Sequence, residues 1–364
     1  MIKDPWCVLG LPFDPVSVAD VRGFIFDAVK NKAVKTLTTT NVNWLVLAHH
    51  DPLFRERLAF SDLNVMDGVP LFWCARFLGY PFPERVAGPA IAEDLIRHKG
   101  GTKIRAYLYG GIGSAAEKAC ARLNKLSVSG LIGAGYCNPG FGDLEAMSAE
   151  DKIRDIQQAA PDMIVLAIGA QKGMAWIEKN RIRFQVGIIS HLGAVINMLA
   201  GTIKRAPRWL QPTGLEWVWR ISQERKLWER YVNDGFVFLF ILLTRLLPLK
   251  WHLTWQRHFE AERTEPEIAL TETSDRVAVS IRGVCNRFGR RNVQEGFLHA
   301  ASAGKNVTID LRETVYFESS FLGNLFLLKK ELKNAGKELL VEGANGRAKK
   351  LFELYGVSNA FAIK

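Results

Sequence analysis

Residues 35–67, KTLTTTNVNWLVLAHHDPLFRERLAFSDLNVMD, indicate the class of the fold. The first eight are rich in β-branched side chains and predict a strand, residues 43–60 follow a helical pattern, and residues 61–67 predict a second strand end. The alternation continues to about residue 200, with strand-like runs in IRAYLYGG (104–111), SGLIGAGY (129–136), DMIVLAIG (162–169) and QVGIISH (185–191). Strands separated by helices of this length predict an α/β domain whose mostly parallel, Rossmann-like sheet is covered on both faces.

Length and composition limit the classes of protein to consider. The chain has 364 residues, 48% of them hydrophobic and 23% charged, which is enough for two globular domains with cores of their own. Its net charge of +11 points to a polyanionic neighbour: nucleic acid, an anionic membrane or a phosphorylated ligand. The five cysteines are widely spaced without a C-x-x-C pair, which favours the cytoplasm over a disulfide framework or a zinc site. Aspartates and prolines interrupt the apolar residues near the amino terminus, so we expect no signal peptide.

Several polar residues and glycines follow the predicted strands. Ligands of parallel α/β sheets bind at the carboxyl ends of the strands, so these residues are candidates to share one crevice. A glycine turn that opens into a helix suits a phosphate, because free amides at the helix start point outward. The alternatives stay open that this turn is only a turn and that Asp67 caps the helix beginning near Pro70. The candidates are Thr39 and Asn41, Asp67, Gly110, Gly111 and Gly113 of the GGIG turn, and Gly169.

Four separated blocks carry a resemblance to a known family. They are TTNVNWLVLAHHD, DGVPLFWCARFLGYPFPERVAGPAIAEDLI, LYGGIGSAAEKA and GAVINMLAGTIKRAPRWLQPTGLEWVWRI. In this order they resemble the WecG/TagA/CpsF family of bacterial glycosyltransferases over about residues 5–231. The resemblance implies transfer of an N-acetylmannosamine-type or related sugar, with inversion and without metal or other cofactor. The implied donor is a UDP-sugar, and the acceptor is an undecaprenyl-diphosphate-linked sugar at the cytoplasmic face of the membrane, in exopolysaccharide, capsule or other cell-surface glycan synthesis.

The resemblance also implies roles for individual residues. Asp67, in the family's DG motif, is the expected general base, since a carboxylate can take the proton of the acceptor hydroxyl. Arg85 is expected to hold the diphosphate of the departing UDP, although as a residue alone it could be an ordinary surface arginine. Thr39 and Asn41 match the family's T-x-N motif and are expected to position the sugar and the base. The chain contains no D-x-D motif, in agreement with metal-free transfer.

One motif departs from the family pattern. Where the family reads G-x-P-x-Q-E, residues 169–174 read GAQKGM, so Gly173 stands in place of an active-site glutamine and Gln171 is a nearby candidate to replace it. Asn197 also stands in place of a family aspartate. These changes leave the donor sugar open and keep an alternative function in view, a catalytically weak scaffold that recruits partners to the membrane surface.

Residues 204–260 form a predicted basic, membrane-associating appendage. Residues 201–260 hold ten Lys or Arg against five Asp or Glu, together with six tryptophans, a mixture that suits the headgroup layer. The run FVFLFILL is shorter than the roughly 20 residues of a spanning helix, so we expect an anchor lying on the surface. A buried core helix or a homo-oligomer interface is the alternative, and no nucleic-acid-binding motif is present. In the family, arginines of this appendage complete the site over the lipid diphosphate, and Arg205 and Arg220 match those positions.

The last hundred residues predict a second domain. Residues 261–275, AERTEPEIALTETSD, are polar and acidic and predict a linker after the transferase core of residues 1–203 and the appendage. Residues 276–364 alternate strand-like and helical runs and resemble a STAS domain, the fold of anti-sigma-factor antagonists. In that resemblance Ser320 takes the phosphoserine position, with Glu318 and Phe321 replacing the usual aspartate and glycine. We expect the domain to bind a protein partner, with phosphorylation of Ser320 as a regulatory alternative.

Overall fold

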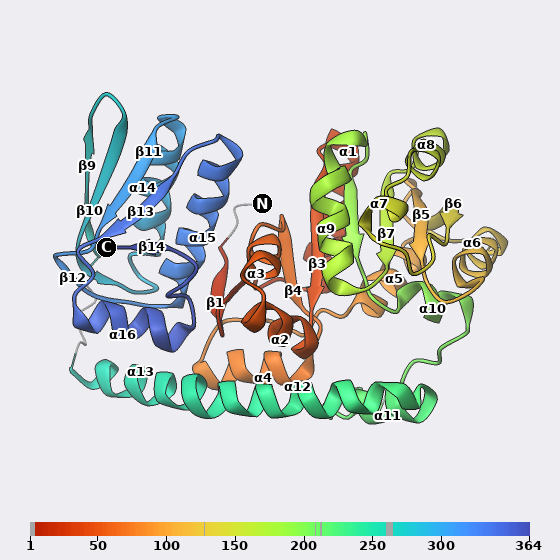
Figure 1. The fold of residues 1–364 in the computed structure, drawn as a ribbon, viewed down its shortest axis with the longest axis horizontal. Coiled ribbons are helices and arrows are strands. Elements are labelled where there is room, and N and C mark those ends of the chain that lie inside the picture. The colour runs from red at the N-terminus through yellow and green to blue at the C-terminus, as the bar shows by residue number, and fades with distance from the viewer. Residues whose placement is uncertain (1–3, 127, 208, 212, 260–264) are drawn as a thin grey trace.

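The computed structural model describes residues 4–126, 128–207, 209–211, 213–259 and 265–364. It contains two α/β units and a long helix that runs beneath both of them (Figure 1). The larger unit is built on a six-stranded sheet in the order β4-β3-β8-β7-β5-β6, and every pairing in it is parallel. The predicted mostly parallel sheet is therefore confirmed. Its strands are β3 (Lys35–Thr40), β4 (Leu63–Met66), β5 (Ile104–Gly110), β6 (Leu131–Cys137), β7 (Met163–Ala167) and β8 (Ile188–His191).

Each face of this sheet has its own hydrophobic core. Successive residues of a strand point to opposite faces, so Tyr107 and Tyr109 of β5 lie in one cluster of buried side chains and Leu108 in the other. The first face is covered by α2 (Val42–His50), α3 (Pro52–Ala59), α8 (Glu150–Ala159) and α9 (Ala170–Asn180). The second is covered by α1 (Val18–Asn31), α5 (Gly88–Arg97), α6 (Ala115–Lys125) and α10 (Val195–Ala200). The remaining elements are the hairpin β1 (Trp6–Val8) and β2 (Leu11–Phe13), α4 (Val69–Leu78) and α7 (Leu144–Met147).

The helix predicted over residues 43–60 is two helices. It breaks between α2 and α3 at Asp51, whose carboxylate accepts a hydrogen bond from the backbone N–H of Phe54 at 3.0 Å. Pro52 follows as the first residue of α3, where the missing N–H of proline is tolerated. The break is thus a local capping effect that hydrophobic periodicity alone does not reveal.

The smaller unit contains a six-stranded sheet. Its strands β12, β10, β11, β13 and β14 are parallel neighbours in that order, and β9 (Glu267–Glu272) pairs with β10 in antiparallel orientation. The linker predicted over residues 261–275 is therefore wrong for 267–272, while residues 261–264 lie outside the described part. One side of β9 is unpaired, and an edge strand facing water can be as polar as a linker. The other elements are β10 (Arg276–Cys285), α14 (Arg290–Ser302), β11 (Asn306–Asp310), β12 (Thr314–Phe317), α15 (Ser319–Asn334), β13 (Leu339–Glu342), α16 (Gly346–Tyr355) and β14 (Ala362–Ile363).

The appendage forms one long helix after a shorter one. After α11 (Glu216–Gln223) and the short turn η2 (Arg225–Leu227), α12 (Trp228–Ile241), the π-helical turn η3 (Leu242–Leu246) and α13 (Leu247–Phe259) follow without a break. By length and composition the 31 residues Arg225–Trp255 would suffice to cross a membrane, so the expectation that the apolar run is too short is wrong. Only 22% of the apolar stretch is buried, and the helix lies along both units instead of projecting from them (Figure 1).

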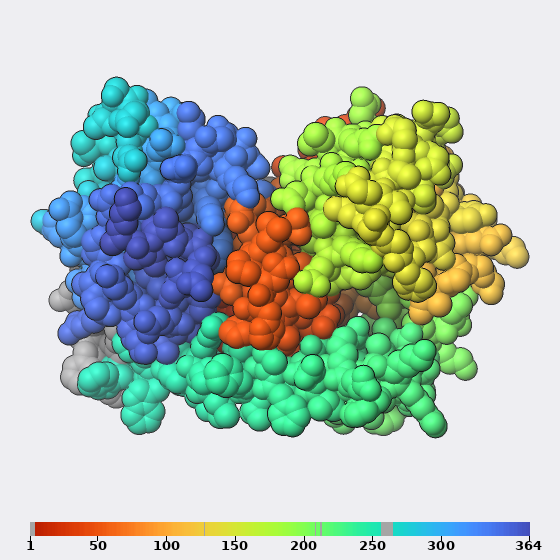
Figure 2. Space-filling model, in the orientation of Figure 1, coloured from red at the N-terminus to blue at the C-terminus, as the bar shows by residue number. Residues whose placement is uncertain are grey.

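The two units are packed together. One continuous cluster of buried apolar side chains includes Trp6 and Tyr80 of the larger unit and Phe321 and Tyr355 of the smaller one. The space-filling view shows the carboxyl-terminal unit in contact with the amino-terminal part of the chain, and the long helix beneath both (Figure 2). The second unit is therefore docked onto the first and not tethered at a distance.

Candidate active site

Three of the predicted site residues meet at the carboxyl ends of β3 and β4. Thr39 is buried near the end of β3, and its hydroxyl donates to the carbonyl of His191 at 3.3 Å. Asn41 begins α2 and accepts a hydrogen bond from the N–H of Trp44 at 3.3 Å. The backbone N–H of Asp67 donates to the carbonyl of Thr40 at 2.9 Å, which holds the start of the DG motif beside Asn41. The strand-end rule thus brings Thr39, Asn41 and Asp67 to one edge of the sheet.

Arg85 joins this edge from the loop before α5. Its Nη1 donates to the backbone carbonyl of Asp67 at 3.1 Å and to the carboxylate of Glu216 at 2.5 Å. Burial raises the pKa of Asp67 to about 6, the charge of Arg85 acts against that rise, and the charge of Glu216 adds to it. A carboxylate with a pKa near the operating pH is suited to take up a proton. The ion pair of Arg85 with Glu216 also ties α11 of the appendage to the site.

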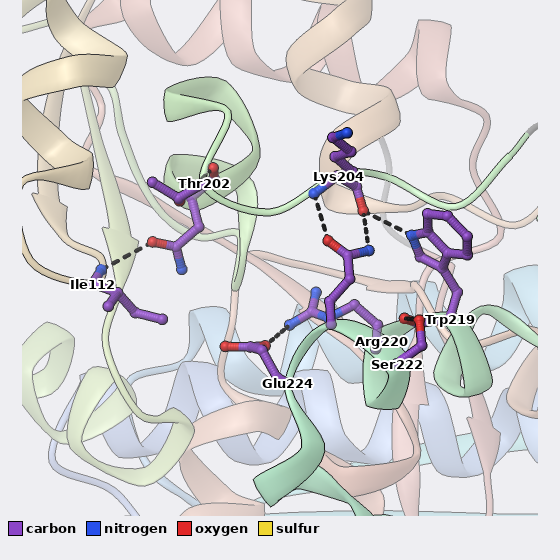
Figure 3. A network of polar contacts seen from close by, with 9 residues as sticks. Ile112, Thr202, Lys204, Trp219, Arg220, Ser222 and Glu224 are labelled. Atoms are coloured by element: carbon purple, nitrogen blue, oxygen red, sulfur yellow. Dashed lines mark hydrogen bonds and ion pairs between the residues drawn. The ribbon is translucent and has the colours of Figure 1, made fainter.

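The GGIG turn is built for close packing. Gly110, Gly111 and Gly113 have φ angles of +107°, +89° and +56°, which lie in the region that favours glycine. The N–H of Gly111 donates to the carbonyl of Ala167 at 2.9 Å, and the N–H of Ile112 donates to the side-chain oxygen of Asn197 at 2.9 Å (Figure 3). Two amides of the turn are therefore already bonded within the protein. These two amides are not free to bind a phosphate. The phosphate site predicted at this turn stays a prediction without support from them.

The loop after β7 does not place Gln171 where the family glutamine was expected. Gly169 begins α9, and Gln171 two residues later donates to the carboxylate of Asp51 at 3.1 Å. Gln171 thus faces the start of α3 and does not occupy the space beside Gly173. That space holds the ring of His191, since a Cβ atom at Gly173 would lie 2.3 Å from its Cδ2. Sequence reasoning missed His191, and the available signal was the pairing of a side-chain-free position with a histidine at a strand end.

The arginines of the appendage are also paired with carboxylates. Arg205 donates to Glu93 at 2.6 Å. Arg220 donates to Glu224 at 3.4 Å (Figure 3). The charge of Arg205 lowers the pKa of Asp67, so Arg205 is within electrostatic reach of that carboxylate. Figure 3 also shows Lys204, whose carbonyl accepts from the indole N–H of Trp219 at 3.0 Å and so holds α11 against the segment after α10.

A cavity of about 320 Å³ lies between α5, α10 and the segment that carries Arg205. Its lining combines apolar side chains with the cations Arg122, Lys204 and Arg205 and the carboxylate of Glu93. Among the described residues, no group of three or more His, Cys, Asp or Glu side chains could hold a metal ion. The expectation of metal-free chemistry is not tested by this and stays a prediction.

Ser320 is buried in the structure. It is only 1% exposed, in the first turn of α15, and its hydroxyl finds no hydrogen-bond partner among the described residues. Its neighbour Ser319 donates to the carbonyl of Cys7 at 2.7 Å, and a Cβ atom at Gly323 would lie 1.7 Å from the carbonyl oxygen of Pro5. A kinase could reach the Ser320 hydroxyl only if the amino-terminal hairpin moved away from α15, so regulation by phosphorylation stays an untested alternative.

Comparison with known proteins agrees with both resemblances. The model of the glycosyl transferase WecG/TagA/CpsF family matches residues 6–251, and the model of the Mlab STAS domain matches residues 268–363. An N-acetylglucosaminyldiphosphoundecaprenol N-acetyl-beta-D-mannosaminyltransferase of Bacillus spizizenii is 25% identical over 209 residues, or 57% of this chain and 79% of that protein. The protein of the same name from Bacillus subtilis is 24% identical over 208 residues, or 56% of this chain and 78% of that protein.

Among solved structures, the anti-sigma factor antagonist SpoIIAA in its unphosphorylated form is 14% identical to the chain. That likeness covers 27% of this chain and 87% of SpoIIAA, with a TM-score of 0.23. The family model, in contrast, matches well over half of the chain and includes the strand ends that carry Thr39, Asn41, Asp67 and Arg85. This protein belongs to the WecG/TagA/CpsF family of glycosyl transferases.

Proposed function

We propose that the chain moves an N-acetylmannosamine-type or related sugar, with inversion, from a UDP-sugar to an undecaprenyl-diphosphate-linked sugar in the synthesis of a cell-surface glycan. The observation that carries the proposal is the place of Asp67 at the strand ends, where its backbone is bonded to Thr40 and Arg85 and its carboxyl has a raised pKa that suits a general base. The names of the two relatives support the classes of donor and acceptor.

In the proposed reaction, Asp67 takes the proton of the acceptor hydroxyl. The acceptor oxygen then forms a bond to the anomeric carbon of the sugar, while the bond from that carbon to the β-phosphate oxygen breaks and UDP departs with the electron pair. Because attack and departure occur on opposite faces, the anomeric configuration inverts. Thr39 and Asn41, both fixed by hydrogen bonds at the strand ends, support this reading as positioning residues.

Arg85 suits the diphosphate of the donor. Its guanidinium holds the carboxylate of Glu216, which has the charge and the planar pair of oxygens with which arginine pairs. We propose that a phosphate of the bound donor replaces Glu216 on Arg85 and that the guanidinium then offsets the charge that develops on the departing UDP. Arg205 and Arg220, each also on a carboxylate, are proposed to exchange partners in the same way.

The cavity beside Arg205 is the proposed site of the acceptor lipid. Its apolar lining suits the first isoprene units and its three cations suit the diphosphate. The reach of the Arg205 charge to Asp67 supports an acceptor held between the cavity and the base.

We also propose that the protein lies on the cytoplasmic face of the cell membrane. The outer side of the long helix presents a row of exposed apolar side chains, and α4 adds Trp73 and Phe77. Such a face suits an in-plane helix better than water, and the net charge of +11 suits anionic lipid. The row consists of Trp228, Val232, Phe236, Leu239, Phe240, Leu243, Leu247, Trp251 and Trp255.

The experiment that tests the function measures UDP released from a panel of UDP-sugars in the presence of an undecaprenyl-diphosphate-N-acetylglucosamine analogue. We expect one donor class to give acceptor-dependent UDP release. Absence of release with every donor would favour the scaffold, for which the side-chain-free Gly173 is the supporting observation. A protein partner of the STAS domain would then have to bind a face other than the buried first turns of α15.

A further inference from the structure

The ring of His191 fills a space that only a glycine at position 173 leaves open. A Cβ atom at Gly173 would lie 2.3 Å from Cδ2 and 2.6 Å from Nε2 of that ring, closer than nonbonded atoms approach. Gly173 is buried in α9, and His191 is the last residue of β8. The two positions are therefore coupled, because a larger residue at 173 would force the ring to move.

His191 connects two loops of the candidate site. Its Nε2 lies 2.7 Å from the carbonyl oxygen of Ile168, the residue before Gly169, and its own carbonyl accepts the hydroxyl of Thr39 at 3.3 Å. β8 lies between β3 and β7 in the sheet, so these contacts cross to both neighbouring strands. The side chain of Trp44 meets the ring edge-on, with centroids 4.8 Å apart. The ring thus ties the start of the β7–α9 loop to the end of β8, while the backbone carbonyl of His191 ties the same strand end to Thr39.

The ring acts as a neutral hydrogen-bond donor. Burial lowers the pKa of His191 to about 4, so the ring is uncharged near pH 7. Nε2 faces a carbonyl and must carry the proton, which leaves a lone pair on Nδ1. Nδ1 is buried and has no hydrogen-bond partner among the described residues. The single bond from Nε2, together with the contact of Trp44, therefore sets the orientation of the ring.

We propose that His191 determines donor specificity as a positioning residue: by holding the Ile168 carbonyl, its ring sets where the β7–α9 loop lies at the edge of the sheet and so the space left for the sugar of the donor. This inference rests on the proposed function and adds to it the residue that selects among UDP-sugars. A change in the ring should alter the relative affinities for different UDP-sugars much more than the affinity for UDP, because UDP carries no sugar.

The test compares two variants of the full chain. His191→Phe keeps an aromatic ring but cannot donate to Ile168, whereas His191→Gln keeps an amide donor. Dissociation constants are measured calorimetrically for UDP, UDP-N-acetylmannosamine, UDP-N-acetylglucosamine and UDP-glucose. We expect His191→Phe to change the ratio of affinities among the three sugars by about tenfold while UDP affinity stays within about threefold. His191→Gln should restore at least part of the wild-type ratio.

An unchanged ratio in folded His191→Phe would overturn the inference, as would an equal loss of affinity for UDP and for all three sugars. If His191→Phe does not fold, the pair His191→Ala with Gly173→Ala, which partly refills the space, serves for the same measurements. That pair should also melt at a higher temperature than Gly173→Ala alone, because removal of the ring relieves the clash. Failure of the proposed function is recognised separately, as a wild-type chain that binds no UDP at all.

Discussion

Two strand-to-helix junctions in this chain look alike in sequence and differ in the structure. At the first, β4 ends at Met66 and the DG motif leads into α4. At the second, β12 ends at Phe317 and two serines open α15. The first junction keeps Asp67 partly exposed beside Thr39, Asn41 and Arg85, whereas the second buries Ser320 under the amino-terminal hairpin.

The difference shows that a strand end becomes a site only where the rest of the chain leaves it open. The burial of Ser319 and Ser320 depends on contacts more than 300 residues away in sequence, such as that of Ser319 with Cys7. Lys330 and Asp62, whose Nζ and carboxylate are 2.6 Å apart, strengthen the same contact between the two units. In this chain the STAS domain uses its α15 face to bind the transferase unit itself.

The largest effect is expected at the first junction, called the open junction because Asp67 is partly exposed there. Asp67→Asn keeps the shape of the side chain but removes the proton acceptor, so turnover should fall about 10²-fold or more. UDP release reports turnover, and calorimetry should give an unchanged dissociation constant for UDP. Asp94→Asn is the matched control, since Asp94 is a partly exposed carboxylate that pairs with Arg22 at 2.8 Å outside the site. Wild-type turnover in Asp67→Asn would remove this carboxylate from the mechanism.

At the second junction, where Ser320 is buried, we expect a substitution to lower stability and not to change regulation. Ser320→Asp places an uncompensated charge in a buried position and should lower the free energy of unfolding by on the order of 3 kcal/mol or more. Ser320→Ala removes a hydroxyl that has no partner among the described residues and should stay within about 0.5 kcal/mol of wild type. Urea denaturation measures both. A Ser320→Asp chain as stable as wild type would mean that this junction opens in solution.

Much of the first junction could be predicted, because the information is local. The alternation of strands and helices, and the rule that ligands bind at carboxyl ends, correctly placed Thr39, Asn41 and Asp67 together. The order of the strands, the docking of the two units and the burial of Ser320 depend on packing between distant segments. No local pattern carries that information.

Some features within the reach of local reasoning were also missed. The polarity of residues 267–272 suits an edge strand as well as a linker, and the apolar run of the appendage continues into a longer helix through Arg245 and Pro248. His191 was missed because its packing depends on the missing side chain at Gly173, and the glycine and the strand-end histidine were not considered together.

The helices that follow the two junctions, α4 and α15, also differ in the exposure of their apolar side chains. Trp73 is 52% exposed in α4, whereas Phe321 in the first turn of α15 is buried. Trp73→Glu should reduce binding to anionic vesicles about tenfold through the loss of one apolar contact, without a change in melting temperature. Vesicle sedimentation measures the binding, and Ile182→Glu, at an exposed apolar residue away from the long helix, is the control. Equal losses in both variants would show that added negative charge, and not the face of α4, is responsible.

The smallest effect concerns the electrostatics of the open junction. Because activity needs the charged form of Asp67, turnover should rise with pH through about 6 and level off above it.

The raised pKa of Asp67 has the opposite effect on folding. The contribution of this group to stability is complete below its ordinary pKa near 4 and is lost as the pH rises through about 6. Glu216→Gln removes a charge that raises this pKa in the free enzyme, so the inflection of the kcat/KM profile, which reports the enzyme before the donor displaces Glu216 from Arg85, should move to lower pH. The variant should therefore exceed wild type near pH 5, by no more than about threefold, and match it above pH 7. Asp94, which pairs with Arg22, is not among the charges that shift the pKa of Asp67. The control Asp94→Asn should therefore leave the inflection in place. An inflection of kcat/KM that stays at the wild-type pH in Glu216→Gln would mean that Glu216 does not raise the pKa of Asp67 in the free enzyme.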